Sequence, residues 1–273
     1  MSAKIYRSLR ELRSIYALIV DMDGVLWRGD TPLPGLLEFF ALLRSHSILF
    51  RLATNNPTRT PQQYVEKLAR MGVQVSPAEI LTSGVVTAQY LAANAPGGAV
   101  YVIGQEGLHQ ALRERGLRLT DGDQPADYVV VGLDQTLTYE KLSRATLLIR
   151  AGAGFIGCNP DVTLPSERGL LPGNGATLAY LQASTGVSPL IMGKPERPIF
   201  EAALAAMGAD PAHTACLGDR LDTDILGAQR AGLHSILVLS GATTREMIAA
   251  SPIQASWVVE DIQALTRVWA ALL

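Results

Sequence analysis

Two carboxylates, Asp21 and Asp23, directly follow the apolar run 16–20 in the stretch YALIVDMDGV. Like charges this close repel each other and lose hydration at the end of a buried segment, so a compensating cation is expected beside them. Residues i and i+2 of an extended segment project to the same side, which lets both carboxylates address one point. Gly24 then frees the backbone to turn away. The pair therefore predicts a cation-binding position.

Other polar residues follow apolar runs elsewhere in the chain. Thr54 and Asn55 end the stretch SILFRLATNN, Asp219 ends TACLGD, and Asp224 comes a turn later in GDRLDTDI. Ligands of open parallel sheets bind beyond the carboxyl ends of the strands, so these residues are expected to share one site with the first two acids. Asp21 and Asp23, together with Asp219, supply hard oxygen ligands, and Mg²⁺ fits such a set while it keeps waters and a substrate phosphate as further ligands.

A positive charge for an anionic substrate is found in the stretch MGKP, where Lys194 follows the apolar PLIM and precedes a segment that begins with proline. A fixed ammonium, the Thr54 hydroxyl and the backbone amides around Asn55 are suited to hold a phosphoryl group against the metal. The combination indicates phosphoryl chemistry.

The elements that position these residues alternate between strands and helices. Continuous apolar strands separated by amphipathic helices indicate an α/β fold with a Rossmann-like parallel sheet, covered on both faces and joined by right-handed crossovers. Strands are predicted at 14–20, 47–56, 214–219, 234–241 and 255–261, and helices at 33–46, 60–72, 199–209 and 224–232.

The middle of the chain repeats this alternation independently, from AVYVIG at 99–104 to ATLAYLQASTG at 176–186. It is predicted to be a second α/β unit inserted into the first. The expected division is a first core segment at 1–95, an inserted cap domain at 96–189 and a second core segment at 190–273. A chain of 273 residues with 48% hydrophobic residues is long enough for two such units.

Composition excludes several other classes of protein. The net charge is −2 and the pI is about 6.1, with no basic cluster, so nucleic-acid binding is not expected. The two cysteines, Cys158 and Cys216, have no metal-binding spacing and suggest reduced thiols in a cytoplasmic protein. The apolar run IYALIV at 15–20 is too short for a signal peptide or a membrane span, so no membrane partner is expected.

Four motifs in order, DMDGV, ATNN, GKP and GDRLDTD, resemble those of the haloacid dehalogenase (HAD) superfamily. More narrowly, DMDGVLWRG, GCNPD, PGNGA and MGKP are similar to its subfamily IIA, the capped phosphatases that include NagD-type nucleotide phosphatases and 4-nitrophenyl, phosphoglycolate and pyridoxal phosphatases. The resemblance implies a HAD core with an inserted C2-type cap and a Mg²⁺-dependent phosphatase of small phosphomonoesters.

By this resemblance Asp21 is the nucleophile that forms an aspartyl-phosphate, and Asp23 is the general acid and base. Mg²⁺ would be bound by the Asp21 side chain, the Asp23 backbone carbonyl and Asp219, with Asp224 orienting that set. An alternative for Asp224 is that the stretch DTDI simply opens a helix, with Asp222 as its cap.

The resemblance also assigns phosphate binding to Thr54, Asn55 and Lys194, although Thr54 could be only a hydroxyl at a strand end. In the cap, Asn159 and Asp161 are candidates for substrate contact, as is Arg168 in the same stretch. An equally good alternative is a turn in which Asn and Asp make local hydrogen bonds.

Partners and alternative functions follow from the same resemblance. The expected partner is a small phosphorylated metabolite, and a homodimer through the cap is plausible. Two other functions stay open. One is a HAD-type dehalogenase, which also uses an aspartate nucleophile but needs neither the second acid nor the metal. The other is a catalytically silent binding or regulatory protein with the same fold.

Overall fold

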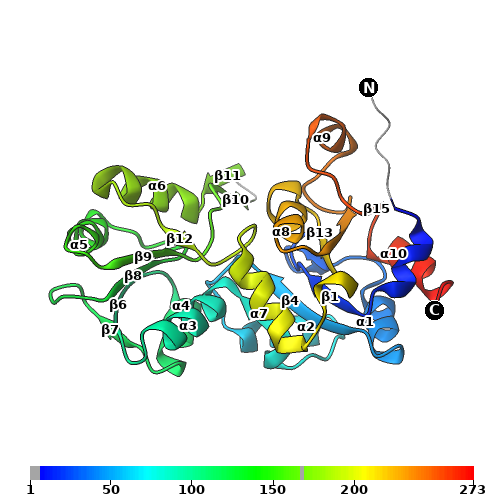
Figure 1. The fold of residues 1–273 in the computed structure, drawn as a ribbon, viewed down its shortest axis with the longest axis horizontal. Helices are drawn as coiled ribbons and strands as arrows, with labels where there is room; N and C mark the ends of the chain where they lie inside the picture. The colour runs from blue at the N-terminus through cyan, green and yellow to red at the C-terminus, as the bar shows by residue number, and fades with distance from the viewer. Residues whose placement is uncertain (1–6, 167–168) are drawn as a thin grey trace. The chain divides into compact units, whose positions relative to one another are not determined.

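The computed structural model describes residues 7–166 and 169–273, which divide into two compact units. The first unit contains the described residues up to Thr54, together with Tyr64–Leu81 and Lys194–Leu273. The second contains Asn55–Gln63 and Thr82–Gly193. Each unit has its own parallel sheet flanked by helices (Figure 1).

A six-stranded sheet in the order β15-β14-β13-β1-β4-β5 forms the centre of the first unit. β1 pairs in parallel with β13 on one side and with β4 on the other, so that Ala17 lies opposite both Thr214 and Leu49. All four residues of β1 are buried, as expected for a strand covered on both faces. The strands are β1 (Ala17–Val20), β4 (Leu49–Thr54), β5 (Ile80–Thr82), β13 (Thr214–Gly218), β14 (His234–Val238) and β15 (Trp257–Val259).

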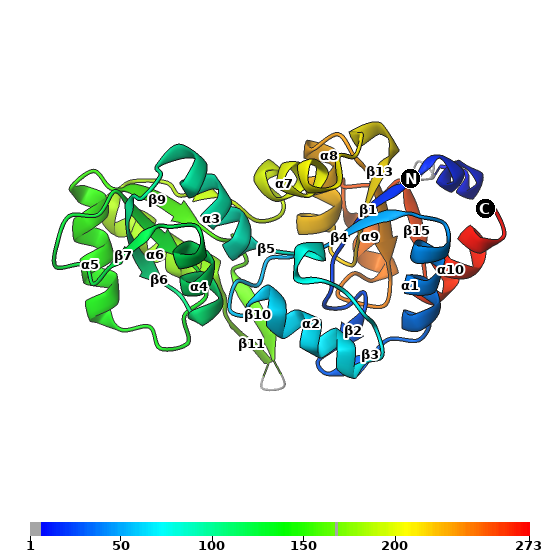
Figure 2. The same ribbon diagram turned by 90° about the horizontal axis from the view of Figure 1, so that it is seen from below.

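Helices cover both faces of this sheet (Figure 2). α7 and α8 pack together on one side, and α1 packs with α10 on the other. α1 buries Leu36, Phe39, Phe40 and Leu43, an apolar stripe at helical spacing that joins the core of the unit. The helices are α1 (Leu36–Ser45), α2 (Pro61–Arg70), α7 (Arg197–Met207), α8 (Leu226–Arg230), α9 (Arg245–Ala250) and α10 (Ile262–Ala270). The predicted parallel α/β sheet is confirmed.

The second unit is built around a five-stranded parallel sheet in the order β12-β9-β8-β6-β7. α3 and α4 pack together on one face and α5 and α6 on the other (Figure 1). The strands are β6 (Ala99–Ile103), β7 (Arg118–Thr120), β8 (Tyr128–Val131), β9 (Gly154–Gly157) and β12 (Leu190–Ile191); the helices are α3 (Ser83–Asn94), α4 (Glu106–Glu114), α5 (Tyr139–Arg150) and α6 (Asn174–Thr185).

Two antiparallel hairpins complete the two units. In the first unit β2 (Trp27–Arg28) pairs with β3 (Thr31–Pro32), directly after the two sequence-predicted catalytic acids. In the second unit β10 (Thr163–Ser166) pairs with β11 (Gly169–Pro172).

The boundaries of the second unit differ from the predicted insert 96–189. It begins at Thr82 because α3 packs along α4, where the small residue Gly84 leaves room for Leu108. It also includes the segment 55–63, where the backbone N–H of Gly107 in α4 donates to the carbonyl of Thr58. Tertiary contact between distant segments set these limits, and no local change of composition marks them in the sequence.

The described residues contain no helix long and apolar enough to span a lipid bilayer.

Candidate active site

Three carboxylates meet at the carboxyl edge of the sheet in the first unit. Asp21 follows β1, Asp219 follows β13, and Asp224 lies in a π-helical turn, Leu221–Ile225, that leads into α8. Each offers one oxygen, and these oxygens lie within 4.8 Å of one another. Because β1 and β13 are parallel neighbours, their ends coincide, and the backbone N–H of Asp21 donates to the carbonyl of Leu217 at 2.8 Å. The predicted meeting of distant acids at one point is found here for these three.

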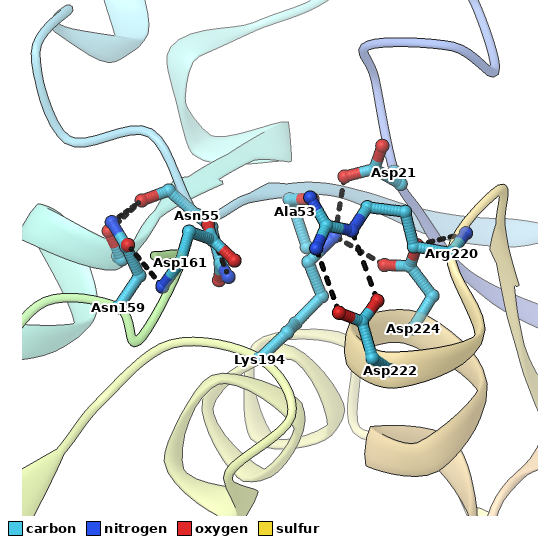
Figure 3. A network of polar contacts seen from close by, with 10 residues as sticks. Asp21, Ala53, Asn55, Asn159, Asp161, Lys194, Arg220, Asp222 and Asp224 are labelled. Carbon is cyan, nitrogen blue, oxygen red and sulfur yellow. Dashed lines mark hydrogen bonds and ion pairs between the residues drawn. The ribbon is translucent and has the colours of Figure 1, made fainter. Parts of the chain in front are cut away.

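The ammonium of Lys194 contacts two of these carboxylates, those of Asp21 and Asp224 (Figure 3). Its Nζ donates to Asp21 Oδ1 at 2.5 Å, to Asp224 Oδ1 at 2.7 Å and to the carbonyl of Ala53 at 3.1 Å. The Lys194 side chain is only 3% exposed, and that of Asp224 only 1%. A buried ammonium with three such acceptors is held rigidly, because a lysine carries three donors and each has a partner.

Burial and mutual repulsion set the electrostatics of the cluster. Burial raises the pKa of Asp21 well above its usual value, and the Asp224 and Asp219 charges raise it further against the opposing effect of Lys194. Burial and the Asp224 charge likewise raise the pKa of Asp219, to about 6. For Lys194, burial lowers the pKa, but the Asp21 and Asp224 carboxylates raise it above its usual value.

The raised pKa values show that the cluster has too little positive charge. Three carboxylates with one ammonium leave two negative charges when all are ionised, and the carboxylate oxygens are hard donors. A divalent cation matches both the charge and the donor chemistry, so the cluster fits such an ion.

Both carboxylate oxygens of Asp224 accept hydrogen bonds, one of them from the backbone. Its Oδ2 accepts the backbone N–H of Arg220 at 3.1 Å, while Oδ1 accepts from Lys194. A Cβ on Gly218 would lie 2.3 Å from the Asp224 Cβ, so only glycine permits this approach. The neighbouring Asp222 instead pairs with the Arg220 guanidinium at 2.8 Å (Figure 3). Asp224 therefore belongs to the acidic cluster, and the predicted helix at 224–232 begins with a wide turn that places it there.

A loop that the sequence reasoning missed encloses Asp219. The backbone N–H of Ala242, just after β14, donates to Asp219 Oδ2 at 2.6 Å. A Cβ on Gly241 would come within 1.9 Å of that oxygen, and a Cβ on Gly24 within 2.5 Å. The signal in the sequence is the pair Ser240-Gly241 at the end of a predicted strand, the same position in the sheet as the other site residues.

Asp23 does not join the carboxylate group. Its side chain is exposed, and Oδ1 accepts the indole N–H of Trp27 at 2.7 Å. The expectation that both carboxylates of the opening pair address one point is therefore not met by the side chains. Thr54 is buried at the end of β4, next to the Ala53 carbonyl that binds Lys194.

Comparison with known proteins agrees with this arrangement. Residues 18–118 match the family model described as haloacid dehalogenase-like hydrolase, and residues 191–265 match a second, HAD-hydrolase-like model. The chain is 41% identical over 251 residues to the acid sugar phosphatase of Staphylococcus aureus, which covers 92% of this chain and 96% of that protein. This chain belongs to the haloacid dehalogenase superfamily.

Similar solved structures of HAD proteins identify the subfamily of this chain. A 4-nitrophenylphosphatase from Thermotoga maritima has a TM-score of 0.90 at 35% identity and covers 94% of this chain and 98% of its own. NagD from E. coli has a TM-score of 0.84 at 34% identity, with 91% and 97% covered. These relatives belong to subfamily IIA, so the predicted subfamily is confirmed, and the chain is a HAD-type phosphoric monoester hydrolase.

The remaining predicted site residues lie in the second unit, where they bind one another. Asn55 Nδ2 donates to Asp161 Oδ2 at 3.1 Å, and the Asn55 carbonyl accepts from Asn159 Nδ2 at 2.7 Å (Figure 3). The backbone N–H of Asp161 donates to Asn159 Oδ1 at 3.1 Å, and Asn174 Nδ2 donates to the Asn159 carbonyl. Only the hydrogen bond from the Asp161 N–H to Asn159 Oδ1 is a local one of the kind that the alternative interpretation expects, and the contacts with Asn55 join distant parts of the chain. Arg168 lies outside the described residues.

Proposed function

We propose that this HAD protein is a Mg²⁺-dependent phosphatase that hydrolyses small phosphomonoesters through an aspartyl-phosphate on Asp21. The observation that supports this most strongly is that Asp21, Asp219 and Asp224 converge on one point, where the buried ammonium of Lys194 binds Asp21 and Asp224. A buried cluster with two surplus negative charges is unfavourable by itself, and a divalent cation with a bound phosphate ester gives it a function.

In this proposal Asp21 and Asp219 hold the metal together with the backbone carbonyl of Asp23, and Asp224 orients the set. Asp224 suits that role because both of its oxygens are already held by protein donors. Mg²⁺, when bound, supplies positive charge that offsets the repulsion among the carboxylates and the phosphate.

The chain's own residues carry out two displacements. A carboxylate oxygen of Asp21 attacks phosphorus, the P–O bond to the substrate alcohol breaks, and protonated Asp23 gives its proton to the departing oxygen. Asp23 then takes a proton from the water that hydrolyses the aspartyl-phosphate. Lys194 holds Asp21 Oδ1 and so restricts rotation of the nucleophile, and with Thr54 and Asn55 it is proposed to bind the phosphoryl group.

For the substrate we propose small phosphate esters, with sugar phosphates as the first class to test. The relative from Staphylococcus aureus is named an acid sugar phosphatase, and two structural neighbours from other organisms are named for 4-nitrophenyl phosphate. The second unit is proposed to act as a cap that selects the alcohol group. A homodimer through this unit stays a prediction from the resemblance.

The decisive experiment is hydrolysis of 4-nitrophenyl phosphate and a panel of sugar phosphates by purified protein, with and without EDTA and added Mg²⁺. We expect activity that EDTA abolishes and Mg²⁺ restores, which a metal-independent dehalogenase would not show. Asp21→Asn should abolish turnover, and radiolabelled phosphate should appear on the wild-type protein but not on this variant. A wild-type protein that hydrolyses no ester with Mg²⁺ would favour a silent binding protein instead.

Asp222→Asn is the matched control, because it makes the same chemical change beside the cluster. The Asp222 carboxylate is 65% exposed and pairs only with Arg220 among the ion pairs of the described residues. Turnover should be close to that of the wild type. Normal turnover by Asp21→Asn would exclude Asp21 as the nucleophile.

A further inference from the structure

A buried tryptophan holds the side chain of Asp23. Trp27, the first residue of β2, is fully buried, and its indole Nε1 donates to Asp23 Oδ1 at 2.7 Å. The indole nitrogen is the only polar atom of that side chain, and a buried tryptophan normally finds a partner for it. Here the partner is an exposed carboxylate that would otherwise be free to change rotamer.

The face of the indole ring is also held in place. Lys67 of α2 places Nζ 4.5 Å from the centroid of the Trp27 ring, within the range of a cation–π contact. The same Nζ donates to the carbonyl of Gly29 at 2.6 Å, in the turn between β2 and β3, and the Lys67 side chain is only 6% exposed. The carbonyl of Trp27 also accepts the backbone N–H of Gly24 at 2.8 Å. The donor that binds Asp23 is therefore a rigid part of the core.

We propose that Trp27 is a positioning residue for Asp23, and that Lys67 supports it by holding the indole and the hairpin turn. This inference rests on the proposed function. With Oδ1 held by the indole N–H, Oδ2 is the oxygen that gives its proton to the substrate alcohol as the P–O bond breaks. It later takes a proton back from water.

Positioning of Asp23 by Trp27 should affect some substrates more than others. An alkyl ester releases a strongly basic alkoxide, so its departure needs the proton from Asp23. 4-Nitrophenolate is a weak base and departs without one. Loss of the indole donor should therefore slow alkyl esters selectively. The quantity to compare is kcat/KM, because it covers the steps up to departure of the alcohol and excludes hydrolysis of the aspartyl-phosphate.

The test is Trp27→Phe, which keeps an aromatic ring and removes the N–H. With Mg²⁺ present we expect kcat/KM to fall about 10- to 100-fold for glycerol phosphate, or another alkyl ester that the wild type hydrolyses, and by less than about 3-fold for 4-nitrophenyl phosphate. Trp257→Phe is the matched control. Trp257 is equally buried, but its indole donates to the Ser8 carbonyl, and its removal should leave the ratio of the two kcat/KM values unchanged.

An equal loss for both esters, or no loss for either, would overturn the proposal, because a merely structural tryptophan affects all substrates alike. Should Trp27→Phe fail to fold by circular dichroism, Lys67→Met is the second variant. It keeps the aliphatic stem and removes the ammonium, and we expect the same selective loss at about 3- to 10-fold, with an equal loss again counting against the proposal. Absence of hydrolysis by the wild-type protein would instead refute the proposed function.

Discussion

Replacing Gly241 with alanine tests how closely the 240–243 loop encloses the proposed metal ligand Asp219. An added Cβ would lie 1.9 Å from Asp219 Oδ2, and real Cβ atoms essentially never come closer than 3.0 Å to such a neighbour. The two groups must therefore separate by at least 1.1 Å, the difference of these distances. Either the carboxylate or the loop has to move.

The size of the effect follows from the hydrogen bond that the movement breaks. The Ala242 N–H lies 2.6 Å from the same oxygen, and a shift of 1.1 Å along that direction lengthens the contact to about 3.7 Å, too long for a hydrogen bond. A hydrogen bond to a charged group contributes about 1.5–3 kcal/mol. Loss of an interaction that orients a metal ligand typically weakens metal binding about 10- to 100-fold, so we expect the Mg²⁺ concentration for half-maximal activity to rise by that factor.

Two readouts test this expectation: the Mg²⁺ dependence of 4-nitrophenyl phosphate hydrolysis, and the increase of the melting temperature with added Mg²⁺. Gly232→Ala is the control. Gly232 has a φ of +74° with nothing within 4 Å of an added Cβ, so alanine there costs about 1–2 kcal/mol of backbone strain without touching the site. An unchanged Mg²⁺ requirement in Gly241→Ala, or an equal change in Gly232→Ala, would refute the reasoning.

Three further predictions concern other parts of the structure. Lys194→Met should leave its two carboxylate partners uncompensated and lower the free energy of unfolding by about 3–5 kcal/mol in EDTA, measured by urea titration. Burial raises the pKa of Cys158 to about 12 and that of Cys216 well above its usual value, so both stay thiols at pH 8. A thiol reagent should find no fast-reacting cysteine in native protein and two after unfolding. Asn159→Ala should lower the stability of the second unit by about 1–3 kcal/mol, seen by hydrogen exchange, because it leaves the Asn55 carbonyl with one donor fewer.

Each of these three predictions has an outcome that would contradict it. Unchanged unfolding of Lys194→Met in EDTA would mean that the carboxylates protonate without cost. Rapid labelling of Cys158 at pH 8 would show that the thiol is accessible in the native state. Wild-type exchange rates in Asn159→Ala would show that its hydrogen bond contributes nothing to the second unit.

Much of the site could be predicted because its residues stand at recognisable places. Asp21 and Asp219 each end an apolar strand, and Lys194 follows another apolar run, so local patterns alone place them at strand ends. The carboxylate of Asp23 was predicted less well. An i, i+2 argument gives only the direction in which a side chain leaves the backbone, whereas the Asp23 carboxylate binds the indole N–H of Trp27 and the chain turns at Gly24.

The residues of the second unit show more clearly what could not be predicted from the sequence. Asn159 and Asp161 are polar residues in a loop, which suits substrate contact and local hydrogen bonding equally well. Only the fold brings Asn55, more than a hundred positions earlier in the chain, against their side chains. The same holds for Gly241, whose importance depends on a carboxylate from another strand.

By itself the sequence determined the parallel α/β class, the order of the motifs and the identity of the acids and the lysine, because burial patterns and strand-end residues are local properties of the chain. The tertiary structure alone decided that β13 and β4 flank β1, that Asp224 faces Lys194 through a wide helical turn, and that α3 belongs to the second unit. The physical reason is that neighbours in a sheet are chosen by packing over the whole chain. Apolar periodicity says which face of a segment is buried, but not which segment covers it.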